Sequence, residues 1–257
     1  MRFDVITLFP ELFAPFLAAG VTRRAYETRL VDVRLWNPRD FAEGNYRRVD
    51  DRPFGGGPGM VMMAEPLMKC LDAIRADREA STSSARTEAA APVVLFSPVG
   101  ERLDHAGVER WSASAGGVLI CGRYEGVDQR FIDACVDVQV SLGDFVLSGG
   151  EIAAMALLDA VARLQPGVLN DESSHAADSF HPALDGLLDC PHFTRPEQWG
   201  GTRVPAELMS GHHAQIEQWR RGQRLLITAR NRPDLIDAAR ATGRLTQEDE
   251  AFLSGPR

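Results

Sequence analysis

The sequence predicts an α/β protein with a mostly parallel sheet, followed by a small helical C-terminal domain. Two short runs, 93–96 and 117–121, are almost continuously apolar, as strands buried on both faces are. A segment of helical spacing, 104–111, lies between them, and this alternation is typical of a parallel sheet. Beyond residue 186 most of the chain has helical spacing, which predicts a separate helical domain.

The first part of the chain supplies two more strands. Residues 3–9 and 30–36 alternate between apolar and polar side chains, as half-buried strands do. Between them, Pro10 opens a helical segment that Gly20 interrupts and that resumes at 21–28.

A long polar, Gly-rich loop is expected at residues 41–60, and loops of this length are usually functional or disordered. Its arginines within 47–52 indicate a binding loop that becomes ordered on its partner. A helix follows at 64–78, with Pro66 in its first turn. Residues 81–91 are low in complexity and predict a disordered surface insertion.

The domain boundaries follow from where helical and apolar patterns stop. We expect an α/β domain at 1–166, a polar linker at 167–185 and a helical domain at 186–257. The helices expected in the last domain span 205–209, 212–226, 233–241 and 246–253.

Three polar, Gly-rich loops follow apolar strands in the first domain. They are residues 97–100, 122–126 and 143–151; the last follows a β-rich run at 136–142 and precedes an apolar helix at 152–164. Such loops build ligand sites at the carboxyl edge of a sheet, where glycine lets the backbone approach a ligand. Together they predict one pocket.

Composition and motifs exclude several other classes. The glycine run at 55–59 has Met60 where a dinucleotide fingerprint needs glycine, and no Gly-Lys-Ser/Thr motif occurs. The four cysteines lack metal spacing and have mostly apolar flanks, which predicts reduced thiols in a cytoplasmic protein. No apolar run approaches a membrane span, and the first residues resemble a strand rather than a signal peptide.

The net charge of −8 argues against a generally basic surface, so local charge matters more. One arginine cluster lies within 39–52 and another within 220–232. Either cluster alone is also what a solvated helix face looks like. The clusters are compatible with an RNA partner without establishing one. The histidines of the second half match no zinc spacing, so no metal ligands are predicted.

Residues 122–126 (Gly-Arg-Tyr-Glu-Gly) and 141–151 (Ser-Leu-Gly-Asp-Phe-Val-Leu-Ser-Gly-Gly-Glu) resemble the bacterial tRNA (guanine-N1) methyltransferases. That family belongs to the SPOUT class of knotted methyltransferases. The resemblance covers nearly the whole chain and includes residues 8–11, 50–60 and 186–196. Motifs of this length and order are highly specific.

The resemblance implies a fold and an activity. It implies a deep trefoil knot formed by the pocket loops, an exception to the rule that chains avoid threading. It implies methyl transfer from S-adenosylmethionine to N1 of the guanine on the 3′ side of the tRNA anticodon, which maintains the reading frame. It further implies a homodimer with the active site at its interface and a requirement for magnesium.

Residue roles carry over by motif position. Asp178 is implied to take the N1 proton of guanine and Arg163 to stabilise charge at O6, although a cation at a helix end is also ordinary dipole capping. The residues predicted to bind the methyl donor are Phe96, Ser97, Pro98, Gly122, Tyr124, Glu125, Gly126, Leu142, Gly143, Asp144, Phe145, Val146, Leu147, Gly149 and Gly150. The residues predicted to bind tRNA are Asp50, Arg52, Ser174, Arg220 and Arg224.

Some positions depart from the family pattern. Phe54, Phe145 and Phe193 stand where tyrosine is often found, and His175 stands where a small residue is usual. Any ligand bond made by such a tyrosine hydroxyl is absent here. Three alternatives remain open: a knotted methyltransferase for another RNA site, a non-catalytic RNA-binding module of this fold, and a metabolite-binding α/β protein without RNA.

Overall fold

The computed structural model describes residues 1–81, 91–170 and 172–255, and the chain forms two compact units, Met1–Asn170 and Asp171–Arg257. The insertion predicted at 81–91 lies almost entirely outside the described residues.

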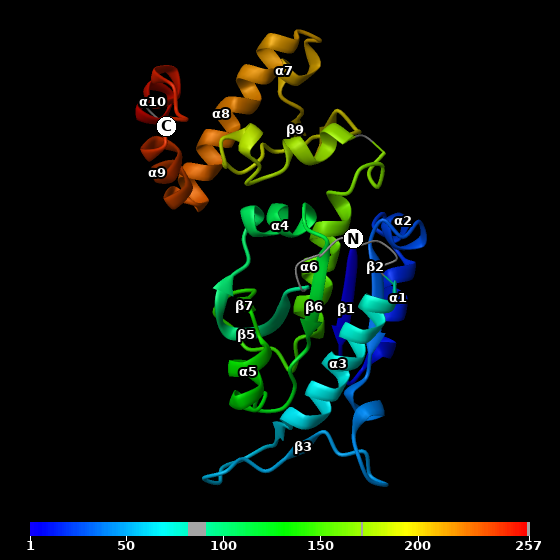
Figure 1. The fold of residues 1–257 in the computed structure, drawn as a ribbon. Coiled ribbons are helices and arrows are strands. Elements are labelled where there is room, and N and C mark those ends of the chain that lie inside the picture. Colours follow the sequence, from blue (N-terminus) through cyan, green and yellow to red (C-terminus); the bar gives the residue numbers. More distant parts are fainter. Residues whose placement is uncertain (82–90, 171, 256–257) are drawn as a thin grey trace. The chain divides into compact units, whose positions relative to one another are not determined.

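A five-stranded parallel sheet organises the first unit, as the sequence predicted (Figure 1). Every strand pair in it is parallel, and this confirms the α/β class. In spatial order the strands are β2 (Asp32–Trp36), β1 (Arg2–Ile6), β6 (Gly116–Ile120), β5 (Val93–Arg102) and β7 (Val138–Ser141).

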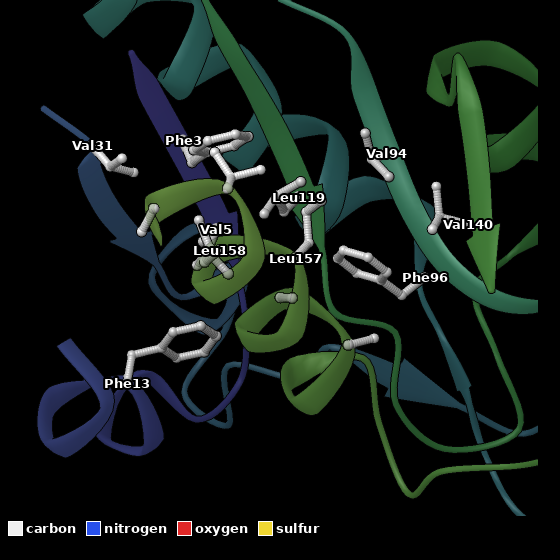
Figure 2. Close-up of a cluster of buried hydrophobic side chains, with 14 of the residues drawn as sticks. Phe3, Val5, Phe13, Val31, Val94, Phe96, Leu119, Val140, Leu157 and Leu158 are labelled. Atoms are coloured by element: carbon white, nitrogen blue, oxygen red, sulfur yellow. The ribbon is translucent and has the colours of Figure 1, made fainter. Parts of the chain in front are cut away.

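Successive side chains of the inner strands point to opposite sides of the sheet. Both faces therefore carry apolar side chains, and helices cover both. On one face, Phe3, Val5 and Leu119 pack with Leu157 and Leu158 of α6 (Glu151–Arg163), as Figure 2 shows. On the other face, the remaining inner-strand residues pack against α3 (Ala64–Ser81) and α5 (Gln129–Cys135). β6 is buried along its whole length, which explains its continuous apolar run.

A buried carboxylate, Asp4, ties β1 to α3. Its oxygens accept hydrogen bonds from Arg2 (Nη2, 2.7 Å), Arg78 (Nε, 2.6 Å) and Trp36 (Nε1, 2.8 Å), while its side chain is fully buried. A buried charge is tolerated where it is paired and hydrogen-bonded, as here.

Shorter elements complete the first unit. The second half of the predicted 41–60 loop is the connection of a small hairpin, in which β3 (Asp50–Asp51) pairs with β4 (Val61–Met62); Val49 and Met62 at its base are buried. These elements are η1 (Pro10–Leu12), α1 (Phe13–Ala18), α2 (Arg23–Glu27), η2 (Pro38–Phe41), β3 (Asp50–Asp51), β4 (Val61–Met62) and α4 (His105–Ser112).

The strand predicted at 93–96 is longer than expected. β5 continues to Arg102, and residues 97–100 form an excursion within it rather than a loop that ends it. Phe96 and Glu101 both pair with Val140 of β7, so the strand resumes its ladder after the excursion. Gly100 lies so close to the β7 backbone that a Cβ there would overlap it.

Two features escaped sequence analysis. α5 was not predicted, although Asp128 caps it by accepting a hydrogen bond from the amide of Arg130 (3.0 Å). In the second unit, β8 (Gln198–Trp199) and β9 (Thr202–Arg203) form a hairpin whose turn contains Gly200 and Gly201, both with positive φ. Positive φ at both central residues characterises the tight turns that suit β-hairpins.

The second unit is otherwise helical. Its core contains Leu187, Leu225, Ile236 and Ala239. Its elements are η3 (Glu172–Ala177), η4 (Pro182–Leu184), β8 (Gln198–Trp199), β9 (Thr202–Arg203), α7 (Ala206–Met209), α8 (His213–Asn231), α9 (Pro233–Ala241) and α10 (Gln247–Ser254). Among the described helices of the chain, none combines the length and hydropathy that crossing a bilayer requires.

Candidate ligand pocket

The three predicted loops line one cavity of about 520 Å³ in the first unit. It opens where β6 and β7 end and where β5 makes its excursion. Of the residues predicted to bind the methyl donor, all but Gly143 and Asp144 line it. Gly143 instead shapes the turn after β7: its amide donates to Ser141 Oγ (3.1 Å) and its carbonyl accepts from that hydroxyl.

The loop at 122–126 is braced by the end of the long 41–60 loop. The amide of Glu125 donates to the carbonyl of Met60 and the amide of Met62 donates to the carbonyl of Gly126, both at 2.9 Å. Gly59 lies directly against the Glu125 side chain, so a Cβ there would overlap it. Two of the predicted binding segments are thus joined edge to edge.

Tyr124 connects the same two segments through its side chain. Its backbone adopts a left-handed conformation (φ 61°), which is uncommon for a residue with a Cβ. Partial burial of the phenol, followed by the nearby carboxylate of Asp50, raises the pKa of Tyr124, while Arg39 opposes the shift. Asp50, predicted to bind tRNA, therefore lies next to a residue that lines the pocket.

The backbone of Gly150 lies against the loop after β6. Its amide donates to the carbonyl of Gly122 (3.0 Å), and a Cβ at Gly150 would lie 2.7 Å from Cys121 Cα. Such a distance is closer than real Cβ atoms approach backbone. The sequence suggested that these glycines make room for a ligand, whereas Gly150 makes room for the protein's own backbone.

A buried ion pair lies beneath this contact. Glu151 is 1% exposed and is the first residue of α6. Its Oε2 lies 2.9 Å from Arg123 Nε, and its Oε1 accepts from Thr7 Oγ1 (2.9 Å) and Arg123 Nε (3.1 Å). Burial, then the charge of Glu151, raises the pKa of the adjacent Cys121 thiol.

Arg123 links the pocket wall to the Ser148–Gly149 loop and to Phe9. Its Nη1 donates to the Ser148 carbonyl (3.2 Å), and its guanidinium carbon lies 4.5 Å from the centroid of the Phe9 ring, within cation–π range. Its Nε occupies the space that a Cβ at Gly149 would need. Gly149 therefore accommodates an arginine side chain and does not open the pocket.

The predicted catalytic residues lie in different units. Arg163 ends α6 and is half-buried. Asp178 is half-buried in the second unit; its amide donates to the His175 carbonyl (3.2 Å) and its carbonyl accepts from the His181 amide (3.2 Å). The side chain of Ser174 lies outside the described residues.

The two arginines predicted to contact tRNA from α8 differ in environment. Arg220 is exposed, and no ion pair among the described residues includes it. Arg224 is 7% exposed, and its Nη1 and Nε lie 2.7 Å from Glu217 and 3.5 Å from Asp189. Arg52 is exposed on the 41–60 loop. Of these arginines, Arg224 is already engaged within its own unit.

Several pocket residues were not predicted as site residues. Arg123 and Ser148 lie inside quoted motifs, and Gln129 and Ile132 belong to the unpredicted α5. The Asp128 cap followed by apolar residues at 131, 132 and 135 was the signal that could have revealed this helix.

Fold and pocket together define an α/β protein with a candidate ligand pocket where strands of a parallel sheet end. Residues 1–238 match the family described as tRNA (Guanine-1)-methyltransferase TrmD. The chain therefore belongs to the tRNA (guanine-1)-methyltransferase family, and the resemblance drawn from the motifs is confirmed.

Relatives of the chain match it over nearly its whole length. The tRNA (guanine-N(1)-)-methyltransferase of Paracidovorax citrulli is 76% identical over 254 residues, which is 99% of this chain and 98% of the relative. The protein of that name from Polaromonas sp. is 74% identical over 254 residues (99% and 96%). The one from Bordetella pertussis is 56% identical over 254 residues (99% and 97%).

We predict that Gly150→Ala destabilises the protein, whereas Gly122→Ala is tolerated. A Cβ at Gly122 would make ordinary contacts of 3.6 Å, and one at Gly150 would press on the Cys121 backbone. Overpacking of this kind costs about 1–3 kcal/mol. Urea unfolding of both variants measures the difference, and equal midpoints would contradict the account of the Gly150 contact.

Proposed function

We propose that the protein transfers a methyl group from S-adenosylmethionine to N1 of the guanine on the 3′ side of the tRNA anticodon. Family membership supports the reaction type and the tRNA substrate. The single observation that carries the donor site is the cavity, because three separate loops contribute its walls and two of them, 122–126 and 141–151, carry family motifs. The cytoplasm, where tRNA is used, is the proposed location.

The cavity suits a nucleoside-sized donor. Its volume of about 520 Å³ falls in the range of roughly 300–1,000 Å³ typical of small-molecule sites. Leu142, Phe145 and Leu147 supply apolar walls for a flat base, and the Gly-rich segment 122–126 supplies backbone polar groups. The donor supplies a methyl group on a positively charged sulfur, so no covalent enzyme intermediate is needed.

Guanine N1 must lose its proton as it becomes the nucleophile. In our proposal the forming N1–carbon bond replaces the carbon–sulfur bond, whose electron pair stays on sulfur, and the N1 proton passes to Asp178. Arg163 stabilises the negative charge that spreads to guanine O6. Positioning and charge stabilisation of this kind are the main means by which enzymes accelerate such displacements.

Magnesium does not enter this proposal as a reagent. Among the residues that line the cavity, Glu125 offers the only carboxylate. Glu151, close behind the wall, is already paired with Arg123 and Thr7. Mg²⁺ is usually held by one or two carboxylates together with substrate oxygens, and this donor set does not define such a site. We derive no step through the ion.

We also propose the knotted topology and a homodimer with shared active sites, both supported by family resemblance. Phe145 and Val146, exposed by 55% and 83%, lie beside the cavity, and Ile152 is 55% exposed in the first turn of α6. Exposed apolar side chains that gather at one place often mark an interface. In the proposed dimer, the 167–185 linker of one chain serves the pocket of the other.

Residues 1–166 are proposed to bind the donor and residues 186–257 to bind tRNA. Asp50, Arg52 and Ser174 are proposed to contact the acceptor near the pocket, and Arg220 to contact phosphate from α8. The exposure of Arg220 supports that role. Arg224 is better suited to holding its own unit together.

We predict that Asp178→Asn abolishes most of the chemistry without preventing binding. With labelled donor and tRNA, the parent protein should yield 1-methylguanosine beside the anticodon, identified by mass analysis of the digested tRNA. The variant should retain donor binding and lose single-turnover methylation by a factor on the order of a hundred or more. Near-parental turnover would show that another group takes the proton.

We predict that Arg220→Ala weakens tRNA binding and lowers its salt dependence by about one unit of slope, since one phosphate contact is lost. Arg224→Ala is the matched comparison on the same helix. It should destabilise the second unit by about 1–3 kcal/mol, because the buried Arg224 side chain and its charged hydrogen bonds to Asp189 and Glu217 are lost. An unchanged salt slope for Arg220→Ala would show that Arg220 is an ordinary solvated surface residue that makes no phosphate contact.

We predict that active sites are shared between two chains. A chain that carries Gly150→Ala at its pocket and a chain that carries Asp178→Asn in its linker should each be inactive alone. Mixing them should restore activity in part, because one site of each mixed dimer is intact. Absence of rescue in chains shown to exchange would rule out sharing.

A further inference from the structure

We infer that Glu151 is a positioning residue for methyl-donor binding, which it supports through Arg123. The inference rests on the proposed donor pocket and adds to it a residue that does not itself line the cavity. Arg123 does line the cavity, and Glu151 lies behind it with 1% exposure.

The Glu151 carboxylate is held between Arg123 and Thr7. Both oxygens of Glu151 lie within 3.1 Å of Arg123 Nε, and Oε1 also accepts from the Thr7 hydroxyl at 2.9 Å. The carboxylate therefore holds Nε in one place. Thr7, whose hydroxyl donates to Glu151, is fully buried, so the carboxylate that pairs with Arg123 is not free to move into solvent.

Arg123, held by Glu151, in turn contacts Ser148, Gly149 and Phe9. Its Nη1 donates to the carbonyl of Ser148 (3.2 Å), and its guanidinium lies over the Phe9 ring. Arg123 also forms an isolated antiparallel bridge with Gly149. One side chain thereby fixes the relative position of the loops after β6 and β7, both of which line the cavity.

The local sequence Gly149-Gly150-Glu151 fits this arrangement. Gly149 leaves room for Arg123 Nε, and Gly150 leaves room for the backbone of Cys121. These two glycines bring Glu151 to the base of the loop as the first residue of α6, where a negative charge also suits the helix dipole. The two glycines and Glu151 together therefore hold the Arg123 side chain in one position.

The test compares two buried carboxylates on the same sheet. Glu151→Gln keeps the shape and removes the charge that holds Arg123. Asp4→Asn is the matched control, because Asp4 is equally buried and ion-paired, while its partners Arg2, Trp36 and Arg78 do not line the cavity. S-adenosylmethionine binding is measured by calorimetry, and unfolding by urea titration.

Both variants should lose stability, but only Glu151→Gln should bind the donor more weakly, by roughly tenfold to a hundredfold, as misplaced binding groups do. Its KM for the donor should rise, with KM for tRNA unchanged. In an Arg123→Gln background, Glu151→Gln should have no further effect on donor affinity, because the group through which it acts is gone.

Thr7→Val provides a milder variant should Glu151→Gln fail to fold, and it should weaken donor binding in the same direction. Donor affinity equal to the parent in Glu151→Gln, or equal losses in Glu151→Gln and Asp4→Asn, would overturn the positioning role. Failure of the parent protein itself to bind the donor would instead overturn the proposed pocket.

Discussion

The pocket depends on how closely the backbone of Gly150 approaches the chain after β6. With the amide of Gly150 bonded to the Gly122 carbonyl, the N-terminus of α6 is held against the end of the central strand. Glycine is needed there because of steric contact, since its φ of −78° is open to any residue. From this contact follow the direction of α6, the burial of Glu151 and the position of Arg123.

The order of the strands explains why three loops meet. β5 lies between β6 and β7 in the sheet, so the loops that leave its two neighbours flank its carboxyl end. The excursion at 97–100 occurs at this point, and the ladder with β7 resumes at Glu101. β5 therefore contributes residues 97–100 to the cavity wall region and then continues in the sheet, whereas a strand that ended at Phe96 would leave the sheet there.

Sequence analysis predicted those parts that depend on local pattern. The apolar runs predicted β6 and the first part of β5, because strands buried on two faces need apolar side chains at consecutive positions. The β-rich run at 136–142 predicted the edge strand β7. The loops were recognisable by glycine and by family motif. The Arg123–Glu151 pair could not be recognised in the sequence, because 28 residues separate its members and a local pattern does not show a contact that only folding brings about.

The same limit applies to charge. The arginines near 220–232 form one cluster in the sequence, yet the structure divides them by their partners. Arg221 is bound by Asp185 and Asp249, the latter with its pKa lowered to about 2, chiefly by the Arg221 hydrogen bond. Adjacent positions in a helix are separated by about 100°, so one residue can face the core while its neighbour faces solvent.

That division explains how a chain of net charge −8 can be proposed to bind a polyanion. An arginine paired with an acid contributes little net field, whereas an exposed arginine with no acid beside it attracts phosphate over roughly a Debye length. Many acids of this protein are consumed in intramolecular pairs, as with Asp4, Asp249 and Glu151. For the proposed RNA binding, the relevant charge is therefore that of particular exposed arginines such as Arg220, which pairs with no acid among the described residues, and the overall sum is a poor guide to it.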